Sequence, residues 1–114
     1  HGTQMQALLK FNDPVTVETV TLSSIIDIGS YLFPPLSIEV WGGDDPKKLK
    51  LLKRINPEQP LTSGPAFMRG FDCTFAPVTV KYIKVTATAL PKLPLWHTGK
   101  GEKGWFFTDE IFVN

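Results

Sequence analysis

Two tryptophans, a histidine and a lysine are gathered in one glycine-rich segment, residues 93–105. These residues are Trp96, His97, Lys100 and Trp105. Large rings on a loop with rigid neighbours suit a site that grips a flat, partly apolar ligand, whereas a tryptophan that only fills a core sits more naturally in a strand or helix. The histidine and lysine can donate hydrogen bonds beside the rings. The segment therefore predicts a ligand-binding loop.

The same segment contains a literal match to the dinucleotide-binding pattern G-x-G-x-x-G, at residues 99–104. That pattern binds a pyrophosphate only where it follows a strand and opens a helix. Here Pro91 and Pro94 precede it, and an apolar, strand-like stretch follows it. The context excludes the nucleotide-binding interpretation.

His97 is the only histidine in the interior of the sequence. A nucleophilic mechanism needs a base within reach of the nucleophile and a group that orients the base, and no such spacing surrounds His97. Asp109 and Glu110 are conceivable metal partners for His97, but the spacing matches no established ligand pattern. We expect His97 to contact a ligand or to be structural, and we expect no catalytic residue in this chain.

Asp109 and Glu110 form a pair of adjacent carboxylates, a residue type that performs glycoside hydrolysis. Adjacent residues on a strand point to opposite faces, so these two cannot flank one glycosidic bond. The sequence therefore argues against catalysis by this pair.

Two further aromatic segments could contribute to the same site. Residues 30–35 place Tyr31 and Phe33 ahead of two prolines that stiffen the chain, and residues 67–69 place Arg69 after Phe and Met. Tyr31 and Phe33 could instead be buried anchors of their loop. Because the loops of a β-sandwich cluster at its ends, we hypothesise that these segments converge on one rim with residues 93–105.

Bulk properties indicate one globular domain of 114 residues, with 42% hydrophobic and 20% charged residues. A net charge of +1 argues against nucleic-acid binding. The single cysteine, Cys73, allows neither an intramolecular disulfide nor a cysteine metal cluster. The basic run at residues 47–54 is interpreted as the solvated edge of a strand or short helix. The sequence opens with His1 and Gly2 in place of methionine, so we expect a domain excised from a longer protein.

Ten prolines and nine glycines divide the sequence into short pieces that are typical of strands. The pieces are residues 6–11, 15–28, 36–41, 71–75, 78–90 and 106–113, with residues 48–55 left as either strand or helical turn. The apolar alternation changes phase between Val17 and Val20 and again at Tyr82, which predicts bulges or bends. A turn is expected at Asn12, Asp13 and Pro14. We predict an all-β fold, an antiparallel β-sandwich of the jelly-roll type.

Together, several of these segments resemble a discoidin-like domain. The matching segments are residues 33–40, 71–77 and 82–85, the Leu-Pro pair at 93–94, Trp96 with His97, residues 99–101, and residues 105–111. This is the coagulation factor V/VIII type C superfamily, which has a galactose-binding-like jelly-roll fold. The chain is most similar to the variant at the C-terminus of Bacteroides-type chitobiases, which are family-20 β-N-acetylhexosaminidases.

The resemblance implies a non-catalytic carbohydrate-binding or accessory module of an exported glycosidase, located outside the cytoplasm. It places a glycan, with N-acetylglucosamine as a component, at a loop rim. The expected ligand-binding residues are Trp96, His97, Lys100, Trp105, Arg69 and Tyr31. No cofactor is required, but such domains often hold a structural calcium, for which Glu110 occupies the matching position. The N-terminal segment that helps bind this calcium is missing, so the fold as given is expected to be incomplete there.

Two alternatives remain open. The module could brace the catalytic domain of its own chain through the aromatic loop without binding sugar. It could also bind a membrane surface through the loop tips, for which Lys100 and Lys103 provide little basic charge. No segment approaches the length of about 20 apolar residues that a membrane-spanning helix needs.

Overall fold

The computed structural model describes residues 4–27, 33–59, 66–89 and 107–114, and within these ranges the chain forms strands and no helix. The strands are β1 (Gln4–Ile26), β2 (Ser37–Gly43), β3 (Lys50–Ile55), β4 (Phe67–Thr88) and β5 (Phe107–Val113). All neighbours pair antiparallel in the order β3-β2-β4-β1-β5. The expected all-β antiparallel fold is confirmed, and residues 48–55, left open above, contain a strand.

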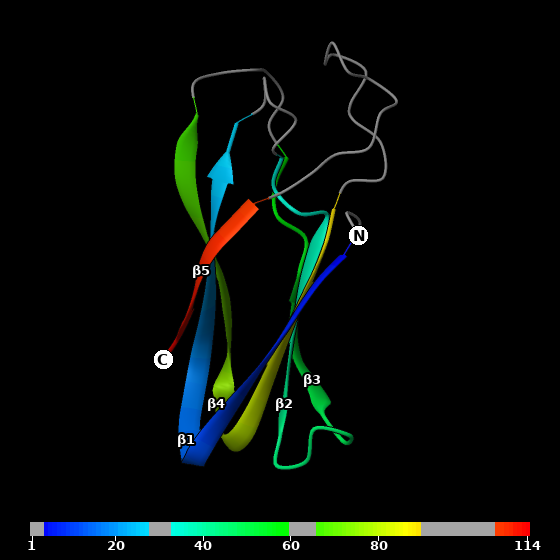
Figure 1. Cartoon of the computed structure of the whole chain (residues 1–114), viewed down its shortest axis with the longest axis vertical. Coiled ribbons are helices and arrows are strands. Elements are labelled where there is room, and N and C mark those ends of the chain that lie inside the picture. Colours follow the sequence, from blue (N-terminus) through cyan, green and yellow to red (C-terminus); the bar gives the residue numbers. More distant parts are fainter. Residues whose placement is uncertain (1–3, 28–32, 60–65, 90–106) are drawn as a thin grey trace.

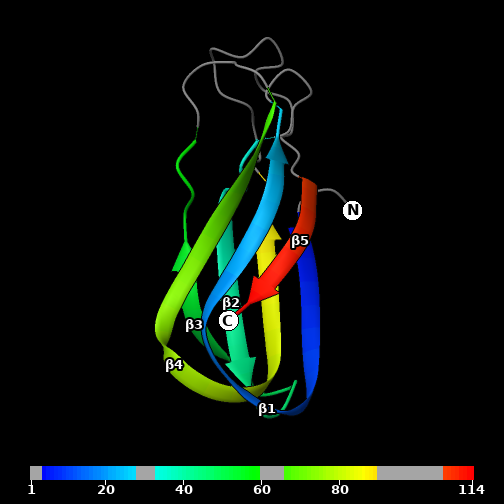
Figure 2. The ribbon, with the colours of Figure 1, turned by 90° about the vertical axis from the view of Figure 1, so that its left-hand side faces the viewer.

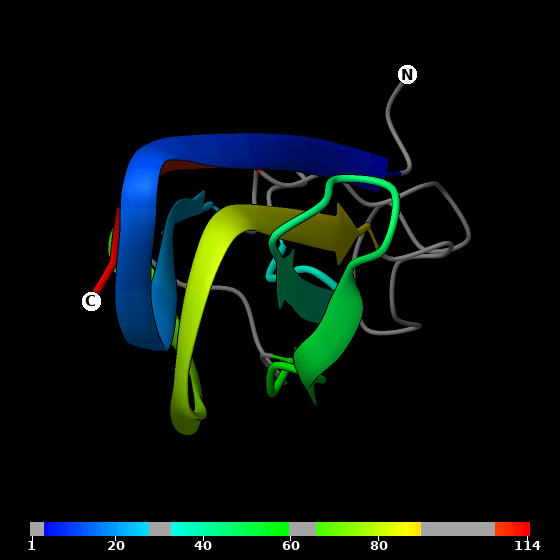
Figure 3. The same ribbon diagram turned by 90° about the horizontal axis from the view of Figure 1, so that it is seen from below.

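The two longest strands fold this sheet into two layers. β1 and β4 run side by side over their whole lengths and bend together, as Figures 1 and 3 show. The first half of β1 and the second half of β4 form a four-stranded layer with β2 and β3. The other halves form a three-stranded layer with β5, visible in front in Figure 2. This arrangement is compatible with a β-sandwich, while the jelly-roll connectivity stays a prediction.

The bends coincide with two interruptions of the β1–β4 register. The first lies on β1 between Lys10 and Val15 and contains Pro14. The second lies on β4 between Thr74 and Val78, opposite the step from Val17 to Thr19 on β1, and contains Pro77. Proline cannot donate to the ladder, so in sheets it is confined to edges and bulges. Both prolines therefore fall where the pairing is already broken.

The turn expected at Asn12, Asp13 and Pro14 is wrong. The chain does not reverse there; it continues as one strand that bends from one layer into the other. The separate strands expected at 71–75 and 78–90 are likewise parts of one strand, β4. Residues 12–14 do mark a bend in β1. Because β1 pairs on both sides of this bend with β4, which bends with it, the chain stays extended through it.

The core lies between the two layers. The phase change predicted between Val17 and Val20 is confirmed by the register shift at that point, and the one near Tyr82 by the burial of both Val80 and Ile83. The buried apolar side chains come from both layers: Val17, Val20, Leu22, Ile26, Phe33, Ile38, Val40, Phe71, Cys73, Val80, Ile83, Val85 and Ala87. Each large one contributes about 1.5–3 kcal/mol relative to leaving it exposed.

Candidate functional site

One end of the sandwich collects the strand ends that flank two of the predicted aromatic segments, residues 30–35 and 93–105, and it also contains the third, residues 67–69, at the start of β4. Ile26 at the end of β1 pairs with Phe67 at the start of β4, and Ile25 pairs with Phe107 at the start of β5. In the other layer, Thr88 near the end of β4 pairs with Ser37 at the start of β2. Figure 1 shows these strand ends gathered in its upper half. The anchors of residues 28–32, 60–65 and 90–106 therefore share one end, which we call the loop end.

Five of the predicted ligand-binding residues belong to two of those segments, residues 28–32 and 90–106. Tyr31, Trp96, His97, Lys100 and Trp105 lie outside the described residues. The structure therefore fixes where the chain enters and leaves their segments, and their roles stay predictions.

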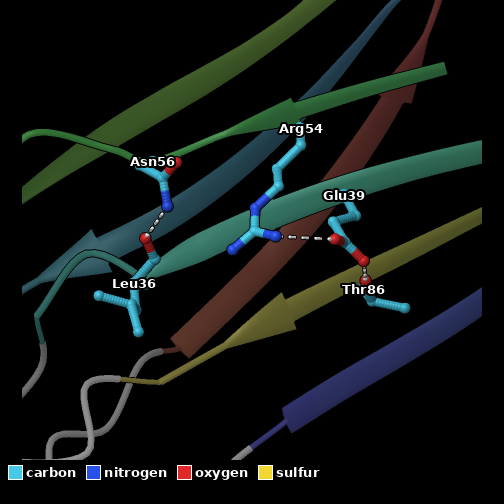
Figure 4. Close-up of polar contacts among 5 residues, drawn as sticks. All are labelled: Leu36, Glu39, Arg54, Asn56 and Thr86. Carbon is cyan, nitrogen blue, oxygen red and sulfur yellow. Dashed lines mark hydrogen bonds and ion pairs between the residues drawn. The ribbon is translucent and has the colours of Figure 1, made fainter. Parts of the chain in front are cut away.

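The segment before β2 is tied to the segment after β3 by side-chain amides. The Gln59 Nε2 group donates to the carbonyl oxygens of Pro34 and Pro35, each at 3.1 Å. Asn56 Nδ2 donates to the Leu36 carbonyl oxygen at 3.2 Å, as Figure 4 shows. Phe33 beside them is only 1% exposed, so it is a buried anchor of its loop and does not line a site. These bonds give the loop end a rigid base.

Arg69 extends this bracing to the three-stranded layer. Its Nη1 group donates to the carbonyl oxygen of Glu58 at 3.1 Å, and its guanidinium lies 4.7 Å from the centroid of the Phe71 ring. The side chain is half-buried, and Phe67, two residues earlier, is 52% exposed. Arg69 thus lies at the loop end as expected, and its contacts in the structure join the two layers.

Glu110 is exposed on β5, opposite Ser23 of β1. Within the described ranges, no group of three acidic, histidine or cysteine side chains is placed to hold a metal ion. Calcium binding at Glu110 therefore stays a prediction. A register shift between Ser23 and Ser24 makes Asp109 the extra residue of a bulge, so strict alternation of faces does not hold at this point.

A second surface, which the sequence interpretation missed, covers the outer side of the four-stranded layer. Cross-strand pairing places Leu8, Lys84, Trp41 and Leu51 in one row from β1 to β3. The Lys84 ammonium lies 5.2 Å from the centroid of the Trp41 ring, and the ring is half-buried. Leu8 and Leu51 at the two ends of the row are 53% and 47% exposed. We call the outward side chains of this layer the Trp41 face.

The next row of the Trp41 face is polar. Thr86 Oγ1 donates to Glu39 Oε1 at 3.4 Å, and Arg54 Nη1 lies 3.6 Å from Glu39 Oε2 (Figure 4). The third row contains Lys10 and Tyr82. Alternation along β2 places Glu39 and Trp41 on one face, and the strand order brings Lys84 and Arg54 to them.

Cys73 lies in the interlayer core and is 1% exposed. Burial, and then the neighbouring Asp72 carboxylate, raise the pKa of its thiol from 9.0 to about 11, with a smaller opposing effect of the Lys53 ammonium. The thiol is therefore protonated and inert at neutral pH. This residue belongs to the core and not to a site.

Comparison with known proteins supports the fold. No protein-family model matches the chain, and no curated protein matches it. Among solved structures, the chain is similar to a protein from Bacteroides thetaiotaomicron described as a "putative alpha-L-fucosidase". The TM-score is 0.57 at 12% sequence identity, over 97% of this chain and 20% of the other chain.

The chain thus spans about a fifth of the length of this similar protein. At 12% identity the likeness shows a shared fold and nothing more specific. The described residues also contain no helix long and apolar enough to cross a membrane.

Proposed function

We propose that this chain is a non-catalytic carbohydrate-binding module of a larger glycoside hydrolase, with its glycan site at the loop end. The observation that carries the proposal is that the strand ends flanking residues 28–32 and 90–106 converge with the aromatic start of β4, residues 67–69, at one end of the fold. Strand ends braced by Asn56, Gln59 and Arg69 form a stiff base, and loops on a rigid base are where proteins commonly place binding residues.

The similar fold within a fucosidase-described protein is consistent with this role, because the chain matches only a small part of that protein. The resemblance of the sequence to discoidin-like domains of chitobiases supports a finer proposal. In it, the parent enzyme is an exported β-N-acetylhexosaminidase that acts outside the cytoplasm, and the glycan contains N-acetylglucosamine.

In the proposed site, Trp96 presents a flat face to the C–H side of a pyranose ring. His97 and Lys100 donate hydrogen bonds to hydroxyl or acetamido oxygens, and Trp105, Tyr31 and Arg69 complete the rim. A shallow site of this kind binds weakly, with a free energy of about −4 to −6 kcal/mol and a Kd of high micromolar to millimolar.

The test is titration of the full chain with N-acetylglucosamine and chito-oligosaccharides, followed by calorimetry and by tryptophan fluorescence. We expect Trp96→Ala to abolish measurable binding. The matched control is Phe112→Ala, which removes a ring that is 45% exposed on β5. Phe112→Ala is expected to bind as the original chain does. If the original chain binds no glycan on a broad array, the proposal is wrong and bracing of the catalytic domain becomes the better account.

A further inference from the structure

Charge is divided unequally between the two layers. Nearly all the basic residues of the described ranges lie in the four-stranded layer, its β2–β3 turn or its corner: Lys10, Lys47, Lys48, Lys50, Lys53, Arg54, Lys81 and Lys84. In those ranges, the strands of the three-stranded layer and the residue after β1 carry Arg69 alone against five acidic residues: Glu18, Asp27, Asp72, Asp109 and Glu110. The four-stranded layer, its turn and its corner also contain the acidic residues Asp13, Glu39, Asp44 and Asp45, so its eight basic residues leave a net charge of +4, against −4 for the three-stranded layer. A chain whose net charge is only +1 therefore has one basic and one acidic side.

The Trp41 face lies on this basic side. Lys84, Lys10 and Arg54 point outward from three different strands, and Lys50 and Lys53 are exposed along the edge strand β3. Glu39 is the one acidic residue among the outward positions described for this face. Its two carboxylate oxygens face Arg54 and Thr86, at 3.6 and 3.4 Å. Lys10, Lys84 and Arg54 together with Glu39 therefore leave this face a net charge of +2.

The same face also offers apolar surface. The half-buried rings of Trp41 and Tyr82 lie on adjacent strands, and the exposed side chain of Leu51 continues the row beside Trp41. Rows on a strand are about 7 Å apart and neighbouring strands about 4.8 Å apart, so cations and rings alternate over short distances. Aromatic rings pack against the C–H faces of pyranoses, and lysine and arginine side chains form ion pairs with carboxylate or sulfate groups.

We propose that the Trp41 face binds an acidic polysaccharide, a chain of pyranose units that carry carboxylate or sulfate groups. Trp41 and Tyr82 contact the sugar rings, while Lys84, Lys10 and Arg54 pair with the anionic groups. The site goes beyond the proposed function, since it uses another surface and another class of glycan. Of the basic run at residues 47–54, it uses Arg54, which pairs with Glu39 on the outer side of the layer.

The test is binding of the full chain to polygalacturonate, which carries carboxylates, and to heparin, which also carries sulfates, at 50 and 200 mM NaCl. We expect binding to at least one of the two polymers that weakens as the salt concentration rises. We expect Lys84→Gln and Arg54→Gln each to weaken it about fivefold, and Trp41→Ala at least as much. Phe112→Ala on the other layer is the control and is expected to bind unchanged. The unfolding temperature of each variant shows whether it is folded.

A charge-compensated variant distinguishes specific binding by the Trp41 face from non-specific attraction by the net charge of the chain. Lys84→Gln with Glu18→Gln restores the net charge of the chain, and Glu18 is exposed on the part of β1 that leads into the other layer. We expect this double variant to bind as weakly as Lys84→Gln alone. Recovery to the original affinity would overturn the proposal, as would absence of binding to both polymers or equal binding to duplex DNA of matched charge.

Binding of acidic polysaccharide to the Trp41 face is expected to be independent of glycan binding at the loop end. We expect Trp96→Ala to keep acidic-polysaccharide binding and Trp41→Ala to keep chito-oligosaccharide binding. If Trp96→Ala abolishes both activities, the two sites are one and the proposal for the Trp41 face is wrong.

Discussion

The two layers share an inner pattern and differ in their outer surfaces. Ile38, Val40 and Val85 face the core from the four-stranded layer as Val20 and Leu22 do from the three-stranded layer. Outside, the four-stranded layer carries rings beside cations, whereas the three-stranded layer carries the Phe112 ring beside hydroxyls and acids. Thr21, which pairs with Phe112, donates through Oγ1 to Asp72 Oδ1 at 2.6 Å. The comparison teaches that the inner residues determine the fold, while the outer residues are free to specialise.

The largest expected effect tests whether both layers contribute equally to the core. Ile83→Ala in the four-stranded layer and Leu22→Ala in the three-stranded layer each remove a side chain that is at most 1% exposed. Each is expected to lower the free energy of unfolding by about 2–5 kcal/mol, because the cavity adds to the lost burial. Urea denaturation measures both. A cost below about 1 kcal/mol for one of them would show that its layer does not share the core.

A second experiment examines the core through Cys73. Because folding raises the pKa of its thiol from 9.0 to about 11, the folded state favours the protonated form. The stabilisation that this provides is present below pH 9 and is lost as the pH rises from about 9 to 11. The loss is on the order of 3 kcal/mol at most.

The measurement is the free energy of unfolding against pH for the original chain and for Cys73→Val. The two proteins differ only at residue 73, so the difference between the two curves isolates the thiol. Parallel curves between pH 8 and 11 would contradict burial of Cys73 in a dry core.

Two glycines offer a sharper comparison of the layers. A Cβ on Gly42 in the four-stranded layer would lie 2.7 Å from Leu52 Cδ1 and 3.3 Å from Ile83 Cδ1, so Leu52 must move. A Cβ on Gly70 in the three-stranded layer would meet only Thr21 Cγ2, at 3.4 Å. Gly42→Ala is therefore expected to cost about 1 kcal/mol, and Gly70→Ala to stabilise the fold by about 0.5 kcal/mol. Thermal unfolding measures both changes, and the unfolding temperature is expected to fall for Gly42→Ala and to rise for Gly70→Ala. A change in the same direction for both variants would contradict the packing described at one of the two glycines.

The smallest expected effect concerns the Arg54–Glu39 pair on the Trp41 face. The atoms are 3.6 Å apart and the Arg54 side chain is 56% exposed, so a double-mutant cycle with Arg54→Gln and Glu39→Gln is expected to give at most about 0.5 kcal/mol. With so small a coupling energy, the Arg54 guanidinium can exchange Glu39 for an anionic group of a ligand. A coupling above about 2 kcal/mol would instead make the pair a structural element of this layer.

The sequence predicted the strands better than their arrangement. Apolar alternation located β2 to within two residues and β5 to within one, and the phase change between Val17 and Val20 located a true irregularity. The corner at Pro14 was mistaken for a turn because a bent strand and a reversing turn use the same local residues. Only pairing with β4, far along the chain, decides between them.

The same limit applies to the candidate sites. Nothing in the sequence around Trp41 indicated that Lys84 would lie beside its ring. The sequence could not assign Phe33 to the core or to a site. In the structure it is 1% exposed, beside the hydrogen bonds that Gln59 and Asn56 donate, and it belongs to the core. The convergence of the loop anchors followed from the general behaviour of sandwiches and is present in the structure.

Amide chemical-shift mapping tests the central claim most directly. On titration of the labelled full chain with chito-oligosaccharide, we expect the affected described amides to cluster at the loop end, around Ala66, Arg69, Ala89 and Phe107. Amides of the β2–β3 turn, such as Lys47, and of the outer three-stranded face, such as Asp72, are expected to stay unchanged. Shifts centred on either of those regions, or none at all at millimolar ligand, would contradict a glycan site at the loop end.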